Sequence, residues 1–143
     1  MADLLHLTML IIHAIGGAII VGSSFVSLLI LINNRIPLEN LKLEERISKF
    51  VGPVLGIQLL TGLYLGISEW DEHGKNPLFW TKLILFIIVG VIARVVTEKR
   101  VASALKKGDV YASMPEVKNW AWISFLLLAL ILIFGVVLVE SHM

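Results

Sequence analysis

The fold is decided by one stretch of sequence, LTMLIIHAIGGAIIVGSSFVSLLILI, residues 7–32. It contains no charged side chain and one histidine, and as an α-helix it is long enough to cross a bilayer, which takes about 20 residues. Three further apolar runs follow at residues 50–68, 78–97 and 119–139. Apolar types make up 57% of the 143 residues, more than a soluble core of this size buries. The sequence therefore predicts an all-α membrane protein, a single four-transmembrane-helix bundle over residues 1–143.

The basic residues predict how this bundle is oriented, because positive charges favour the cytoplasmic side in short loops. Of the 12 lysines and arginines, ten fall in the two connections on one side of the membrane and two fall on the other side. We therefore expect a multi-pass protein of the cell membrane with both termini outside. The ten are Arg35, Lys42, Arg46, Lys49, Arg94, Lys99, Arg100, Lys106, Lys107 and Lys118, and the two are Lys75 and Lys82.

Composition excludes several classes of function. The chain has no cysteine, which rules out disulfides, thiolate metal sites, c-type haem attachment and iron–sulfur clusters. Its net charge of +1 is the total of a basic inner side and an acidic outer side. We therefore expect the lipid bilayer, and no nucleic acid, as a partner. Residues 7–32 are too long for a signal peptide and lack its basic flank, which predicts a retained helix.

Small residues in the first two predicted helices indicate close helix packing. Two glycine pairs, Gly52 with Gly56 and Gly62 with Gly66, lie in the second apolar run, and residues 14–22 carry small residues at the same spacing. Such spacings let helix backbones approach each other in lipid. They would also make room for a flat cofactor, and spacing alone does not separate these two interpretations.

Ionisable side chains inside the apolar runs are the best candidates for a site, because they are costly in lipid and usually face a partner or a cavity. His13 is the deepest, and it shares a helix face with His6 and Met9, at spacings i, i+3 and i+7. His13 is either an axial haem ligand or metal ligand, or a histidine hydrogen-bonded across helices to a group such as Gln58. His6 lies near the outer interface, where histidine is tolerated.

Lys82 is the second candidate, one turn inside the third apolar run and on the same side of the membrane as His13. Its ammonium group either reaches the outer headgroups, or pairs with an anion such as a haem propionate, or ligates iron. Gln58, near the middle of the second run, is interpreted as the partner in an interhelical hydrogen bond.

Short motifs along the chain resemble a known superfamily of small four-helix membrane proteins. Residues 13–22, with a histidine nine positions before a glycine, resemble the first helix of the copper-export D proteins. Residues 45–65, with Glu-Arg, a proline and then Gly-Leu-Tyr-Leu, resemble the second helix of the HemJ-type protoporphyrinogen oxidases. Residues 80–83 match the Trp, Lys and Leu that open that family's third helix, and residues 114–117 stand where the family has a short acidic stretch with a proline.

This resemblance implies a protein that binds b-type haem through His13, with Lys82 near the tetrapyrrole. If the chain is an enzyme, the resemblance implies an oxidoreductase like the protoporphyrinogen oxidases. Two features of that family are missing here: an arginine late in the first helix, in residues 25–28, and a histidine late in the third, in residues 90–93. Their absence argues against oxidase turnover and leaves the haem site in place.

We therefore expect a membrane protein that binds haem b near the outer leaflet and serves in redox chemistry or electron transfer. Its cofactor-binding residues would be His13, His6, Lys82 and Met9, with His13 and His6 as the metal ligands. A quinone, a tetrapyrrole or a redox protein would be its partner. The second axial ligand stays open, and a second chain in a homodimer is one source of it.

Two other functions also fit the sequence. A copper or other metal ion transporter would use His6, Met9 and His13 as successive ligands. A non-catalytic structural subunit of a membrane complex would use His13 for packing alone. A visible spectrum of the purified protein distinguishes these functions from haem binding.

Overall fold

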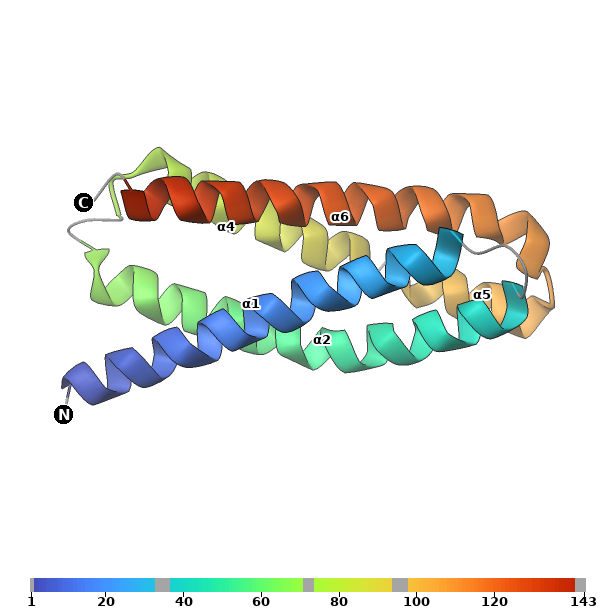
Figure 1. Ribbon diagram of the computed structural model, residues 1–143, viewed down its shortest axis with the longest axis horizontal. Helices are drawn as coiled ribbons and strands as arrows, with labels where there is room; N and C mark the ends of the chain where they lie inside the picture. The colour runs from blue at the N-terminus through green and yellow to red at the C-terminus, as the bar shows by residue number, and fades with distance from the viewer. Residues whose placement is uncertain (1, 33–36, 71–73, 94–97, 141–143) are drawn as a thin grey trace.

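The computed structural model describes residues 2–32, 37–70, 74–93 and 98–140. All regular structure in these ranges is helical, so the predicted all-α class is confirmed. Figure 1 shows an elongated bundle in which α1, α2 and α6 run lengthwise and α4 and α5 follow one another along the remaining side. The helices are α1 (Ala2–Ile32), α2 (Pro37–Ser68), α4 (Pro77–Val91), α5 (Lys99–Lys107) and α6 (Val110–Glu140).

Three helices, α1, α2 and α6, are long and apolar enough to cross a membrane. Helix α4 is apolar too, but its 15 residues span only about 22 Å at 1.5 Å per residue, less than a hydrocarbon core of about 30 Å. Large apolar side chains such as Leu60, Leu126 and Ile133 face outward. A surface this apolar suits lipid and not water.

The helices extend beyond the apolar runs of the sequence. Helix α2 begins at Pro37, so the charged residues 38–46 form the first turns of the same helix. Helix α6 begins at Val110, nine residues before the predicted start at residue 119, and Pro115 lies inside it. Residues 114–117, which precede the fourth apolar run, are therefore part of the same helix.

Tertiary packing explains the early start of α6. Met114 and Val117 are buried in a cluster with residues of α1, α2 and α5, and only a helix directs both into that cluster. Pro115 cannot donate a hydrogen bond to the carbonyl of Tyr111. Tyr111 is 79% exposed at the end of the bundle, so water can take that bond.

Local capping residues set the other helix ends. Gly108 has a φ of 71° and ends α5, because glycine readily adopts the left-handed conformation that closes a helix. The Asn76 side chain accepts a hydrogen bond of 2.9 Å from the Leu78 amide at the start of α4. An ion pair between Arg100 and Glu116 joins α5 to α6.

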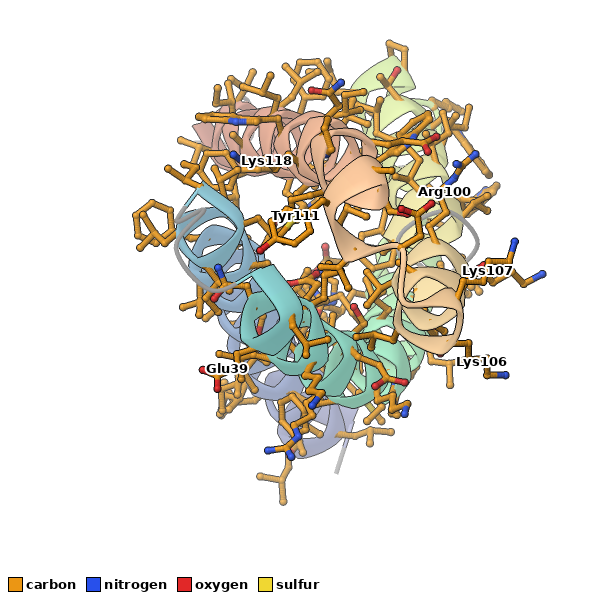
Figure 2. All side chains as sticks on the ribbon, turned by 90° about the vertical axis from the view of Figure 1, so that its right-hand side faces the viewer. Glu39, Arg100, Lys106, Lys107, Tyr111 and Lys118 are labelled. Atoms are coloured by element: carbon orange, nitrogen blue, oxygen red, sulfur yellow. The ribbon has the colours of Figure 1, made fainter. Side chains whose placement is uncertain are left out.

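The two ends of the bundle differ in what they bury. We call the end that carries α5 the basic end; Figure 2 views it with Arg100, Lys106, Lys107 and Lys118 labelled, and Lys106 and Lys107 project away from the bundle. The opposite end, where α1 begins and α6 ends (Figure 1), is the terminal end. The main apolar core lies toward the basic end and comprises Leu28, Leu31, Leu41, Val101, Ala104, Val110, Met114, Val117 and Ala121.

A second, smaller apolar cluster lies nearer the middle of the bundle. It is formed by Ile20, Val89, Leu128 and Ile131, which come from α1, α4 and α6. Beyond it, toward the terminal end, the residues that α1 and α2 bury against each other include Gly16, Gln58 and Thr61. Polar side chains and glycines therefore occupy the positions where the candidate site was predicted.

Candidate functional site

The side chain of His13 lies half-buried between α1 and α2 and is held by two residues of α2. Its Nδ1 atom lies 3.0 Å from the hydroxyl oxygen of Thr61, and its Nε2 atom lies 3.2 Å from the amide nitrogen of Gln58. Gln58 and Thr61 are one helical turn apart and both are buried. We call these three residues the His13 cluster.

We assign the tautomer of the imidazole from these contacts. The Thr61 hydroxyl lies 2.9 Å from the Ile57 carbonyl oxygen and 3.2 Å from the Gln58 carbonyl oxygen, and we assign its one hydrogen to these backbone acceptors, so that it accepts from His13. Nδ1 therefore carries the proton and donates to Thr61. Nε2 carries a lone pair and accepts from the Gln58 amide. His13 is thus a neutral imidazole with Nε2 as its basic nitrogen.

Glycines make room for this cluster. A Cβ atom at Gly62 would lie 3.0 Å from Cε1 of His13, and a Cβ atom at Gly16 would meet the Gln58 side-chain oxygen. Gly66 likewise makes room for the ring of Phe79 on α4. In this structure the small residues at positions 62 and 66 accommodate aromatic rings of the protein itself. Gly56, by contrast, has open space beside it.

The Gln58 amide is only partly satisfied. Its nitrogen donates to His13, but its oxygen Oε1 is buried and has no hydrogen-bond partner among the residues that the structure describes. An unsatisfied buried acceptor is destabilising. A group that replaced Gln58 on Nε2 would therefore also have to leave the Gln58 amide a new partner.

Lys82 lies on α4 and is half-buried, with its Nζ atom 3.4 Å from where a Cβ atom of Gly135 on α6 would be. Its charge is close enough to act electrostatically on the His13 imidazole. The structure thus brings the two principal predicted site residues near each other, although they lie on different helices.

His6 and Met9 lie on α1 between His13 and the terminal end of the bundle. His6 is near the end of the bundle, with Nε2 3.1 Å from a carboxylate oxygen of Glu69 and Nδ1 3.4 Å from the Ser68 hydroxyl. Met9 is half-buried between His6 and His13 on α1. Across the described ranges, no three His, Cys, Asp or Glu side chains lie where they could together hold a metal ion.

Aromatic side chains gather at the terminal end, a placement typical of a membrane interface. The rings of Trp70 and Trp80 are 6.0 Å apart, and those of Phe79 and Trp80 are 5.5 Å apart. The Trp80 indole donates a 3.0 Å hydrogen bond to the Gly74 carbonyl oxygen. These contacts fix the start of α4, which positions Lys82.

Thr61 and Glu44 are buried polar residues that the sequence did not single out. Thr61 gives no separate signal in an apolar run, although its spacing of three from Gln58 puts both on one helix face. Glu44 lies in a charged stretch that resembles a solvent-exposed surface. Glu44 lies three residues after Leu41 and four residues before Ser48, so these three side chains share one face of α2. That face turns inward.

Comparison of the chain with known protein families, with curated proteins and with solved structures gave no match. The functional argument therefore rests on the geometry of the His13 cluster and of Lys82.

Proposed function

We propose that the protein crosses the membrane four times with both termini outside. The crossings would be α1, α2, the segment that contains α4, and α6. Two observations support this topology. Helix α1 begins and α6 ends at the same end of the bundle, and α4 and α5 lie in line beside α6 (Figure 1). Described basic residues gather at the opposite end (Figure 2), which is the cytoplasmic end under the positive-inside rule.

We further propose that the His13 cluster binds haem b, and that Nε2 of His13 would hold the iron. The observation that supports this function is the position of the Thr61 hydroxyl beside Nδ1 of His13. Histidines that ligate metals donate their other ring N–H to an oxygen, which orients the ring and raises the basicity of the ligating nitrogen. Thr61 accepts that hydrogen bond at 3.0 Å, and Nε2 is left with its lone pair.

The residues around Nε2 fit this role. Iron would replace the Gln58 N–H at Nε2, a hydrogen bond of 3.2 Å from an amide whose oxygen is unsatisfied. The ammonium group of Lys82 would balance the charge of a propionate, because an isolated charge inside a membrane is costly. A bound b-type haem would supply one-electron transfer at this position.

The proposed role of the protein is therefore electron transfer or redox chemistry near the outer leaflet. A quinone, a tetrapyrrole or a redox protein would exchange electrons with it. His6 is engaged with Glu69 and Ser68, so a second axial ligand would come from Lys82 or from a second chain in a homodimer. The site would belong to an oxidoreductase only if a substrate binds beside it.

The test is the reduced-minus-oxidised visible spectrum of protein purified from haem-replete cells. We expect b-type bands, loss of most of them in His13→Ala, and their retention in the matched control His6→Ala. In Thr61→Val, which keeps the shape but removes the acceptor for Nδ1–H, haem affinity should fall about 10- to 100-fold, as for other partners of metal-ligating histidines. A colourless wild-type protein would contradict the proposal.

A structural role for His13 is the competing function, and one observation favours it: both ring nitrogens already have protein partners. If the role is purely structural, His13→Ala should lower the thermal stability of a colourless protein. His13→Gln would then restore much of that stability, because an amide can also bond to Thr61. Haem binding predicts instead that His13→Gln loses the spectrum.

A further inference from the structure

The second polar region of the molecule is a cavity of about 70 Å³ between α1, α2, α4 and α6. It lies on the basic side of the His13 cluster and shares none of its residues. Apolar side chains such as Val51, Leu55 and Val89 form much of its wall. Its polar lining includes Glu44 and Ser48 from α2, Ser23, Ser24 and Ser27 from α1, and Ser124 from α6.

Two polar atoms of this lining are buried without a partner. Glu44 is 4% exposed and Ser124 is 8% exposed. The hydroxyl groups of Ser27 and Ser48 hydrogen-bond to the Glu44 carboxyl group. Even so, Oε2 of Glu44 and Oγ of Ser124 have no hydrogen-bond partner in the described part of the chain.

Leaving such atoms unpaired is unfavourable, and most strongly so for a carboxylate. Protonation alone does not solve the problem, because a hydroxyl on Oε2 would still have no acceptor among the described residues. The cavity instead has room for a bound group, since one water-sized probe needs about 10–15 Å³. A group located there would bond to atoms of α2 and α6 at once.

The donor atoms indicate the class of ligand. They are carboxylate and hydroxyl oxygens, which suit hard cations and not copper or other soft metals. Among the described residues of the lining, Glu44 is the deeply buried carboxylate, and it balances a single positive charge. Glu98 also lines the cavity, but it is partly exposed and has an interaction of its own.

We propose that this cavity binds a monovalent alkali cation, such as Na⁺, between the Glu44 carboxylate and the Ser124 hydroxyl. The cation would link α2 to α6 across the bundle. This proposal does not depend on haem at His13, because the two sites share no residue.

The experiment measures the thermal unfolding of the full-length protein in detergent at constant ionic strength. NaCl and KCl are compared with N-methylglucamine chloride and with MgCl₂. We expect the alkali salts to raise the melting temperature by roughly 5–10 °C when the cation is about 100-fold above its dissociation constant. N-methylglucamine is too large for the cavity, and Mg²⁺ would leave one positive charge unbalanced. Neither cation should therefore raise the melting temperature.

Variants assign the effect to the cavity. Glu44→Gln keeps the size of the side chain and should abolish the difference between NaCl and N-methylglucamine chloride. Ser124→Ala, a smaller change, should reduce it. The matched control is Glu45→Gln, because Glu45 pairs with Lys49 on the outer face of the same helix. This variant should respond to the salts like the wild type.

Equal melting temperatures in all four salts would mean that water alone fills the cavity, and would overturn the proposal. An undiminished response in Glu44→Gln, or a response to MgCl₂ that equals the response to NaCl, would also overturn it.

Discussion

The two ends of the bundle are stabilised by different contacts. Toward the basic end, four helices bury an apolar cluster that includes Leu31, Leu41 and Val117. Toward the terminal end, α1 and α2 meet through the His13 cluster and through glycines that make room for it. Polar groups are expensive inside a membrane, and the proposed haem site lies toward the terminal end, while the basic end contributes the main apolar packing.

This comparison predicts that the largest loss of stability follows truncation in the apolar cluster. Leu41 is 0% exposed, so Leu41→Ala leaves a cavity, and we expect the free energy of unfolding to fall by about 3 kcal/mol. The matched control is Leu60→Ala on the same helix, because Leu60 is 69% exposed. Thermal unfolding in detergent measures both variants. Equal losses would show that the bundle is not held mainly at the basic end.

At the terminal end, the predicted loss concerns the site and not the whole fold. In Gly62→Leu the new side chain meets the His13 ring, which is 3.0 Å from the position of the first added carbon. We expect haem retention to fall at least about 10-fold, which corresponds to 1.4 kcal/mol. Gly56→Leu is the control because nothing lies within 4 Å of its Cβ position. The visible absorbance per mole of protein is the measurement, and loss in both variants would contradict the assignment of Gly62.

The smallest predicted effect is that of Lys82. If its ammonium group balances a propionate, Lys82→Met should weaken haem retention a fewfold or shift the midpoint potential, and Lys82→Arg should have less effect. If Lys82 ligates iron, Lys82→Met should change the spin state. Redox titration followed by absorbance distinguishes the two. A spectrum and potential that match the wild type would show that Lys82 only reaches the headgroups.

The sequence predicts most of the fold because the signals are local. Long charge-free runs identify α1, α2 and α6, and Gly108 marks the end of α5. The start of α6 is not predicted, because it depends on the packing of Met114 and Val117 against other helices. Pro115 therefore gives the wrong local signal.

The candidate site is predicted in part for the same reason. His13 and Lys82 are visible in the sequence as ionisable residues in apolar runs. The pairing of His13 with Thr61 depends on how α1 and α2 are aligned, which the sequence does not specify. The burial of Glu44 depends on the rotation of α2, and the neighbouring charges at Lys42, Glu45 and Arg46 conceal it.

Ligation of haem iron by His13 is the central claim, and rescue of His13→Gly by imidazole tests it most directly. Removing the side chain next to Gly62 and Gln58 leaves space for free imidazole, which can bond to Thr61 as the histidine does. The measurement is the reduced-minus-oxidised spectrum of His13→Gly, reconstituted with haem, without and with imidazole. We predict no b-type bands without imidazole and their return with it. Bands of wild-type intensity in His13→Gly without imidazole would contradict the account.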